Sequence, residues 1–357
     1  MKVLFLVPYP TEGASNRIRV EQFLPFLEEN GVKYRVRPFI NKRFYDILYL
    51  PYHYVQKAFW FAICTINRIL DLARAVGYDV IFIHREAFPF GGAIIESILH
   101  RMGKPIVFDF DDAIFLPNTS SANIYIDRFK SPGKVARIIG MSKCVIAGNN
   151  YLKQFALKFN KNVIVIPSSI DTGKYKRRLR STADGEVVIG WMGSGTTKDF
   201  LHSLEPVFAK LSGMHKNITF KLVGAGSKEK RQGNVIYKKW KMEEELADLN
   251  SFDIGIMPLP DTEWAKGKCG FKAILYMACG LPVVVSPVGA NLDIVDDGVN
   301  GFFASNEAEW VNAVSKLAGD EGLRRAMGGK GREKVMQKYS LQYTAPLFLK
   351  CLVEAYE

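Results

Sequence analysis

Short apolar runs recur along the whole chain. Each has the length of a β-strand, is rich in apolar or β-branched residues, and is bounded by polar or turn residues. In the first half the runs are Val3–Pro8, Val80–His84, Pro105–Asp109, Cys144–Gly148 and Val163–Pro167. In the second half they are Val187–Met192, Ile218–Val223, Val235–Tyr237, Ile254–Met257, Pro282–Ser286 and Gly301–Ala304. We expect these segments to be strands.

Most of these strands are separated by segments with apolar residues three and four positions apart, which predicts helices. The expected helices are Val20–Glu29, Ile94–Arg101, Lys198–Leu211, Glu243–Asn250, Phe271–Cys279, Glu307–Ala318 and Leu323–Tyr339. Strands that alternate with helices form parallel sheets covered on both faces. The pattern therefore predicts an α/β protein with two Rossmann-like, doubly wound domains that face each other across a cleft.

A polar, basic segment separates the two halves. The sequence GKYKRRLRSTADGE after Asp171 is nearly free of apolar residues, which is typical of a linker. We expect an N-terminal domain at 1–170, a linker at 171–185 and a second domain at 186–338. The last segment, 339–357, is expected to be a helix that packs back on the first domain. A length of 357 residues fits two domains.

Composition places the chain among ordinary globular proteins. Apolar residues make up 48% and charged residues 24%, which excludes a disordered chain. No apolar run approaches the roughly 20 residues that span a bilayer, and MKVLFLVPYP lacks the features of a signal peptide. The five cysteines form no CxxC pair, which argues against zinc sites and disulfides and favours a cytosolic protein.

The charge is less ordinary, because the net charge is +12. Residues 1–170 contribute most of it, with 22 Lys and Arg against 13 Asp and Glu. Such an excess suits an anionic partner such as nucleotide phosphates, an anionic lipid surface or nucleic acid. Nucleic acid is the weakest of the three, since the basic residues are not interleaved with aromatic residues in any recognised module.

The first predicted strand leads into a small-residue loop. Gly13, Ala14 and Ser15 precede a helix, where free backbone N–H groups favour an anion, and Arg17 and Arg19 stand beside them. The alternative is a flexible loop with solvated arginines.

The second domain begins in the same way. Gly193 and Gly195 follow its first strand and permit a tight turn. Ser194, Thr196 and Thr197 add hydroxyl groups, and Lys198 adds a positive charge where a helix opens. The segment matches neither the Walker loop nor the GxGxxG motif, so the motif alone is weak evidence. It is of interest because it forms the first strand-to-helix turn of the second domain.

A glycine-rich basic loop follows the strand that ends near Pro258. Lys266, Lys268, Gly270 and Lys272 lie at the start of a predicted helix, where positive charge opposes the helix dipole. This arrangement is favourable if an anion is bound there. The alternative is that the loop lysines are simply solvated.

Polar residues also end two strands of the first half. His84 ends one strand, and Asp109, Asp111 and Asp112 end the next. The carboxylates could ligate Mg²⁺, act as acid–base groups or cap a helix. His84 fits either a hydrogen bond to a ligand or a packing role.

Residues 45–68 are dense in aromatic side chains. Phe59, Trp60, Phe61, Ile63 and Ile66 could form an apolar surface in a lipid headgroup region, and the neighbouring basic residues favour an anionic membrane. A core helix that packs on the sheet is the alternative.

These features together resemble the nucleotide-sugar glycosyltransferases of the GT-B fold, in the large retaining family four. The resemblance covers nearly the whole chain and is carried by MACGLPVVVSP, DGVNGFF, VIPSSID and KLVGAG. It implies that donor phosphates lie against the first turn of the second domain and the basic loop. The residues in these roles are Gly193, Ser194, Gly195, Lys198, Lys268, Gly270 and Lys272.

The resemblance implies further roles outside the phosphate site. Gly224 and Trp240 would frame the base, while Gly13 and Arg17 would border the reaction centre and His84 would lie in the cleft.

The chain departs from the family at one motif. Family members carry Glu-x7-Glu leading into the helix, and the second Glu binds the donor ribose. The corresponding positions here are Gly267 and Leu275, so Glu263 or Asp261 becomes the candidate for the ribose.

The resulting hypothesis is a cytosolic, hexosyltransferase-type glycosyltransferase, with peripheral membrane contact as one possibility. It would move a sugar from a UDP- or GDP-linked donor to a glycan or lipid-linked acceptor in cell-surface polysaccharide or glycolipid synthesis, with retention. Arg17 and His84 would position donor or acceptor, and Lys198 and Lys272 would stabilise the leaving diphosphate without a metal. The rival hypothesis is a catalytically degenerate subunit that binds or scaffolds a glycan-assembly complex, which the loss of both Glu supports.

Overall fold

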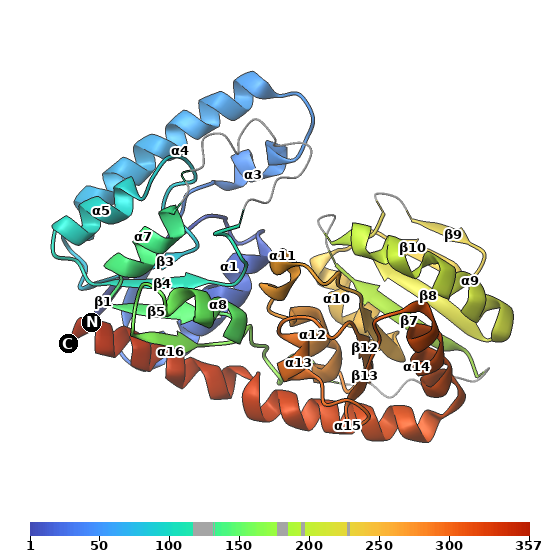
Figure 1. The fold of residues 1–357 in the computed structure, drawn as a ribbon. Helices are drawn as coiled ribbons and strands as arrows, with labels where there is room; N and C mark the ends of the chain where they lie inside the picture. The colour runs from blue at the N-terminus through green and yellow to red at the C-terminus, as the bar shows by residue number, and fades with distance from the viewer. Residues whose placement is uncertain (117–130, 132, 177–184, 194–196, 227–228) are drawn as a thin grey trace. The chain divides into compact units, whose positions relative to one another are not determined.

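The computed structural model describes residues 1–116, 131, 133–176, 185–193, 197–226 and 229–357. The chain divides into two compact units, which are described separately (Figure 1). The first unit contains Met1–Ser168 and Thr344–Glu357, and the second contains Ser169–Tyr343. The GT-B fold class predicted from the sequence is borne out, since each unit is built on its own parallel-rich sheet flanked by helices.

The sheet of the first unit has the strand order β2-β1-β3-β4-β5-β6, with all pairs parallel. Its strands are β1 (Lys2–Val7), β2 (Lys33–Pro38), β3 (Val80–His84), β4 (Ile106–Phe110), β5 (Cys144–Ala147) and β6 (Val163–Val165). The central strands are buried on both faces, as continuous apolar runs such as VLFLV require. The order reverses between β1 and β3, which makes this position the topological switch point of the sheet.

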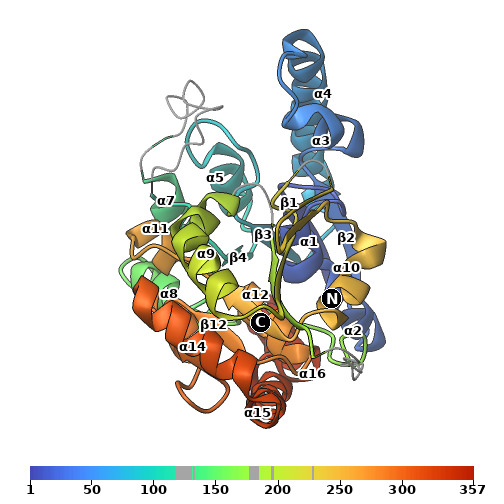
Figure 2. The same cartoon turned by 90° about the vertical axis from the view of Figure 1, so that its right-hand side faces the viewer.

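Helices cover this sheet. They are α1 (Ala14–Arg19), η1 (Glu21–Phe23), α2 (Leu24–Glu29), α3 (Lys42–Leu48), α4 (Tyr54–Ala75), α5 (Ile94–Arg101), α7 (Lys134–Met141), α8 (Asn150–Ala156) and α16 (Leu341–Tyr356). The long helix α4 lies beside α3 and α5 (Figures 1 and 2).

The C-terminal helix α16 packs on the first sheet although its residues are far from that sheet in sequence. The ring of Phe348 stacks on Phe23 at a centroid distance of 4.5 Å and lies 5.1 Å from the ring of Phe82. A disulfide joins Cys144 at the start of β5 to Cys351 in α16. The expectation that the cysteines form no disulfide was therefore wrong. The two residues are 207 positions apart, so only the packing of α16 brings them together.

The sheet of the second unit has the order β13-β12-β11-β7-β8-β10-β9, and only its edge strand β9 is antiparallel among the described pairs. Its strands are β7 (Val187–Met192), β8 (Ile218–Val223), β9 (Lys230–Gln232), β10 (Val235–Lys238), β11 (Ile254–Met257), β12 (Val283–Val285) and β13 (Gly301–Phe303). The order reverses between β7 and β11, so the switch point of this sheet lies there.

Two layers of helices cover the second sheet, and alternate residues of β7 face each layer. Val188 and Met192 join the core beneath α12, whereas Ile189 and Trp191 join the core beneath α9 and α14, which lie side by side (Figure 2). The helices are η3 (Lys198–Leu204), α9 (Glu205–Met214), η4 (Met242–Glu244), α10 (Glu245–Asn250), α11 (Glu263–Lys266), α12 (Phe271–Ala278), α13 (Asn291–Ile294), α14 (Glu307–Gly319) and α15 (Glu321–Lys338).

The largest differences from the predicted elements are at the sheet edges. Strands β2 and β9 were not expected, because KYRVRP and KRQ lack an apolar run. Both are edge strands, which bury less of their surface. The predicted helix Lys198–Leu211 is also divided into a 3₁₀ segment, η3, and α9 at Pro206, which favours the first turn of a new helix.

Candidate functional site

The switch point of the second sheet brings together the end of β7 and the start of α12. The Lys272 ammonium donates a hydrogen bond to Thr197 Oγ1 at 3.1 Å and lies 5.2 Å from the centroid of the Trp191 ring. The Cα of Gly193 fits closely between these groups. A Cβ there would lie 2.5 Å from the Trp191 ring and 2.8 Å from Lys272 Cε. The glycine is therefore required for the lysine to reach this position.

The neighbouring strand β8 ends beside the same turn. Gly224 has a φ of +85°, and a Cβ on it would overlap the carbonyl oxygen of Gly193. Its backbone N–H donates to the carbonyl of Lys238 at 2.8 Å. Trp240 lies next to Gly224 and donates from Nε1 to Glu245 at 3.0 Å. Glycine at both strand ends thus permits backbone contact where a side chain would separate the strands.

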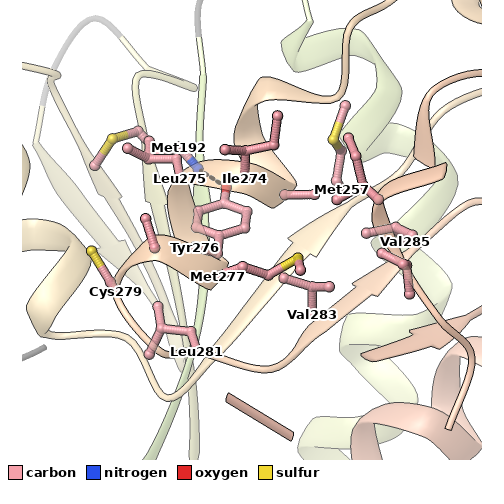
Figure 3. Packing of buried hydrophobic residues seen from close by; sticks show 14 of the residues in the cluster. Met192, Met257, Ile274, Leu275, Tyr276, Met277, Cys279, Leu281, Val283 and Val285 are labelled. Carbon is pink, nitrogen blue, oxygen red and sulfur yellow. Dashed lines mark hydrogen bonds between the residues drawn. The ribbon is translucent and has the colours of Figure 1, made fainter. Parts of the chain in front are cut away.

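Helix α12 is fixed to β7 from inside the core, as Figure 3 shows. The buried hydroxyl of Tyr276 accepts a hydrogen bond from the backbone N–H of Met192 at 2.8 Å, and burial raises its pKa well above the ordinary value. Gly255 in β11 leaves room for the Tyr276 ring. Leu275 is 4% exposed and belongs to this apolar cluster. The position that corresponds to the second Glu of the family motif is therefore part of the core.

The three lysines of the basic loop before α12 have different described contacts. Lys266 pairs with Glu263 at 2.8 Å and with Asp261 at 3.5 Å, on the exposed helix α11 and the loop before it. Lys268 lies 5.1 Å from the centroid of the Trp264 ring. Gly270 has a φ of +65° and precedes the first residue of α12. Of the three lysines, only Lys272 has a described contact with the turn after β7.

Three other predicted phosphate contacts are less defined. Lys198 is exposed at the first residue of η3, one position after Thr197. Ser194 and Gly195 lie outside the described residues. Their roles stay predictions.

The switch point of the first sheet holds a chain of polar contacts. His84 at the end of β3 is fully buried, and its Nδ1 lies 2.7 Å from Asp109 Oδ2. Its Nε2 lies 2.5 Å from Oγ of Ser15, in the helix that follows β1. Arg19, also buried, forms an ion pair with Asp109 and donates to the carbonyl of Ile166 at 2.8 Å.

The electrostatics of this chain keep Asp109 ionised. Burial by itself raises the pKa of this carboxyl, but the charge of Arg19 and the hydrogen bond from His84 outweigh it and lower the pKa below its ordinary value. An ionised carboxylate only accepts hydrogen bonds, so the proton between the two side chains resides on His84 Nδ1.

Arg85 holds the other two carboxylates. Its guanidinium lies 2.7 Å from Asp111 Oδ1 and 2.7 Å from Asp112 Oδ2. Burial opposes the ionisation of Asp111, yet Arg85 lowers the pKa of this carboxyl below its ordinary range. The carboxylates predicted as Mg²⁺ ligands are thus engaged by arginines and a histidine. Within the described part of the chain no three His, Cys, Asp or Glu side chains group as a metal site.

Gly13 and Arg17 build the loop that carries Ser15. The N–H of Gly13 donates to the carbonyl of Pro10 at 2.8 Å, and a Cβ on it would lie 2.6 Å from Cβ of Tyr9. The Arg17 guanidinium donates to the carbonyls of Thr11 and Glu12 at 2.8 and 3.1 Å. Arg17 therefore braces the loop, and its predicted contact with a ligand stays a prediction.

One residue of these clusters, Trp191, was given no role from the sequence. Trp191 stands two positions before Gly193, so the alternation of a strand places both on the same side, which was an available signal. Ser15 and Arg19 were expected at an anion site after the first strand, and their contacts with His84 and Asp109 were not predicted. Their partners lie 69 and 90 positions away, and the sequence does not show which strands are neighbours.

Comparison with known proteins agrees with this architecture. Residues 186–320 match the family model described as glycosyl transferases group 1. HepE of Anabaena, solved with UDP and glucose, superposes with a TM-score of 0.69 at 16% identity over 99% of each chain. Sucrose-phosphate synthase of Thermosynechococcus elongatus gives 0.69 at 15% identity over 98% of each. The resemblance to group 1 glycosyltransferases with the GT-B fold is confirmed.

The curated relatives match shorter parts of the chain. An uncharacterised glycosyltransferase of Methanocaldococcus jannaschii is 31% identical over 127 residues, 33% of this chain and 35% of the relative. The capsular polysaccharide biosynthesis glycosyltransferase CapM of Staphylococcus aureus is 22% identical over 186 residues, 48% of this chain and 47% of the relative. The matched part of this chain thus spans less than half the length of either relative.

Proposed function

We propose that this protein is a glycosyltransferase that moves a sugar from a nucleotide diphosphate donor to a glycan or lipid-linked acceptor. The observation that carries the proposal is the Gly193–Thr197–Lys272 cluster at the switch point of the second sheet. Negative charge develops on the leaving diphosphate as the glycosidic bond breaks. A lysine held beside Gly193 at the end of β7 stabilises that charge.

The finer features of the proposal follow from the same site and from the relatives. HepE is solved with UDP and with UDP-glucose, which supports a UDP-linked hexose donor, with GDP as the alternative base. CapM belongs to capsular polysaccharide biosynthesis, which supports a role in cell-surface polysaccharide synthesis. We propose transfer with retention and, because Lys272 supplies the positive charge, phosphate stabilisation without a metal.

The rival proposal is a degenerate subunit that binds or scaffolds without catalysis. The observation that favours it is the burial of Leu275 where the family has a carboxylate for the ribose. Gly267 is likewise without a side chain at the other motif position. Glu263, the proposed substitute, is engaged by Lys266 on an exposed helix, so ribose binding would require that ion pair to rearrange.

Calorimetric titration of UDP- and GDP-sugars, with and without Mg²⁺, tests the proposal. We expect saturable, metal-independent binding of a nucleotide sugar to the wild type. In Lys272→Ala we expect the rate of sugar transfer to fall about 10²- to 10³-fold, because one donor that stabilises the leaving diphosphate is removed. Lys266→Ala is the matched control, since that lysine lies in the same loop but pairs with Glu263 and Asp261. Absence of binding across the panel would support the scaffold instead.

A second part of the proposal is a membrane location for the acceptor. Helix α4 exposes an apolar stripe in which Val55, Phe59, Ile66 and Ile69 are each more than half exposed. From Ala58 to Ala73, all within the described chain, the only charged side chains are Arg68 and Asp71, and both are buried. The helix thus turns its charges inward and its apolar side chains outward.

Charge at the borders of this stripe favours an anionic bilayer surface as its occupant. Lys57 lies in the first turn of α4, and Arg43 of α3 lies over the Trp60 ring. Lys42, paired with Glu12, precedes Arg43, and Arg74, paired with Asp71, lies in the last turn of α4. None of the described helices is long and apolar enough to cross a membrane, so we propose a peripheral contact at a cytoplasmic face.

Vesicle sedimentation checks this contact. Vesicles with anionic lipid are expected to bind the protein and neutral vesicles to bind less. Phe59→Asp with Ile66→Asp should lower binding at least tenfold while the fold is retained, since both side chains face outward. Equal binding by the double variant would exclude this stripe as the contact, and a concentration-dependent dimer would assign it to a second copy of the chain.

A further inference from the structure

The chain passes between the two units twice. It leaves the first unit after Ser168 and returns to it at Thr344. All the strands of the first sheet precede the first crossing. After the second crossing the chain adds only α16 to the first unit, because the segment Thr344–Glu357, described throughout, contains no other helix or strand. The second crossing is therefore anchored in the first unit by the docking of α16.

One face of α16 holds this helix on the sheet. Its buried side chains recur every three to four positions and are Thr344, Ala345, Phe348, Cys351, Leu352 and Ala355. This spacing places them on one face of the helix. Phe348 supplies the stacking contact with Phe23. Cys351, about one turn further along, supplies the disulfide to Cys144. The anchor thus combines apolar packing with one bond that redox chemistry can make or break.

The disulfide closes a covalent ring that contains the whole second unit. The ring runs from Cys144 through both crossings to Cys351, which is 207 positions away, and so includes all of Ser169–Tyr343. While the bond is intact, the middle of α16 cannot leave the start of β5. Once the bond is broken, only noncovalent contacts hold α16, and their loss requires a local opening rather than the unfolding of the sheet.

The state of the bond depends on the surroundings and on the packing of α16. Reduction takes up two electrons and two protons and yields the thiols of Cys144 and Cys351, and oxidised glutathione reverses it by thiol–disulfide exchange. The two residues are 1% and 2% exposed, so an exchange partner reaches the sulfurs only when the packing around them opens. Each redox state therefore persists once it has formed.

We infer that the Cys144–Cys351 disulfide is a redox-sensitive clamp that locks the second crossing of the chain onto the first unit. Oxidising surroundings close the clamp, and a compartment rich in thiol reductants opens it. Cys64 and Cys279 are also buried but form no disulfide, so burial alone does not produce the pairing. The inference is independent of the proposed function, because neither the bond nor its tests involve a nucleotide sugar.

Peptide mapping tests the bond. Protein purified without reductant is unfolded, treated with iodoacetamide, digested and analysed by mass spectrometry, with and without prior reduction. We expect the peptides of Cys144 and Cys351 to be joined to each other until reductant is added, and Cys64 to be alkylated in both samples. Recovery of Cys144 and Cys351 in separate peptides from the unreduced sample would overturn the inference.

Hydrogen exchange of the folded wild type tests the clamp. We expect the backbone amides of α16 to exchange about tenfold faster after reduction by a phosphine, because the cross-link no longer opposes local opening. The amides of α15 in the second unit should keep their rates. Equal exchange of α16 in the oxidised and reduced proteins would overturn the inference, since the bond would then have no effect on docking.

Variants separate loss of the bond from other effects of the reductant. Cys144→Ala removes the bond without changing α16, and Cys351→Ala removes it from the helix. Both should exchange like the reduced wild type and should not respond to the phosphine. Cys64→Ala is the matched control, because it changes a buried cysteine of the same unit outside the disulfide and should keep the response. A response that survives in Cys144→Ala would contradict the clamp. If both bond variants fail to fold, the wild-type comparison decides.

Discussion

The two switch points use opposite means to hold polar groups beside a strand end. In the first unit Asp109 and Arg19 are buried and paired with each other, and His84 and Ser15 extend the chain towards solvent. In the second unit the Lys272 ammonium lies over the Trp191 ring and donates to the Thr197 hydroxyl.

This difference separates two physical roles. A buried ion pair sets the state of its neighbours but has little charge left to offer a ligand. A lysine over the face of an aromatic ring is attracted by the ring quadrupole, which helps to hold the ammonium at the strand end. The comparison thus sets a buried ion pair in the first unit against a lysine held at a strand end in the second.

Removing one partner of the buried pair should have the largest effect. Asp109→Ala leaves the Arg19 charge buried without its partner, which is expected to cost about 3–5 kcal/mol of unfolding free energy. Asp248→Ala in the second unit is the contrast: its partners Lys221 and Lys238 are 18% and 20% exposed and keep some hydration. Urea unfolding measures the free energy of unfolding of both variants. Equal losses would contradict the view that the Arg19–Asp109 pair is more costly to break because it is more deeply buried.

The glycine contact of the second unit should come next. Gly224 and Gly233 both have positive φ, so alanine costs about 1–2 kcal/mol of conformational strain at either. A Cβ at Gly224 also overlaps the backbone of Gly193, whereas one at Gly233 meets nothing within 4 Å. We expect Gly224→Ala to lose about 1–3 kcal/mol more than Gly233→Ala. If the melting temperature fell equally in Gly224→Ala and Gly233→Ala, the ends of β7 and β8 could move apart to accept the added Cβ without further cost.

The carboxylates of the first unit should also make stability depend on pH. The pKa values of Asp109 and Asp111 are lowered by folding, so the stability they provide is complete above the ordinary carboxyl pKa of about 4. It is lost as pH falls from there towards the folded values. Asp111→Asn should flatten the fall in unfolding free energy between pH 5 and 3. If the unfolding free energy of Asp111→Asn fell with pH as steeply as that of the wild type, the lowered pKa of Asp111 would not be a source of this pH dependence.

The smallest effect should come from Lys268. Its cation–π contact with Trp264 lies on the surface loop, and Lys268→Ala is expected to cost only about 0.5–1 kcal/mol of stability. Donor affinity, measured by the same calorimetry as for Lys272→Ala, should fall much less than in that variant. If donor affinity fell equally in both variants, the phosphate site would include Lys268 in the loop before α12.

The local features of the second unit were accessible from the sequence. The β7 and β8 strands, Gly193 at the end of β7, and the helix start with Lys272 all follow from residue patterns within a few positions of one another. Apolar runs and glycines determine such features because backbone sterics and hydrophobic burial act on neighbouring residues. The edge strands β2 and β9 were not predicted, because an exposed edge strand does not need the apolar run that marks a buried strand.

Only the tertiary structure decided the contacts between distant strand ends. The register that pairs His84 with Asp109 selects the partner of the histidine, and the β1–β3 neighbourhood adds Ser15. Likewise, the packing of α16 joins Cys351 to Cys144, and the burial of Leu275 excludes it from a polar role. A sequence encodes which residues prefer burial, but the pairing order of strands emerges from the packing of the whole sheet. The sequence alone thus determined the fold class and the candidate loops, whereas the partners of His84, Asp109 and Lys272 were decided by the folded chain.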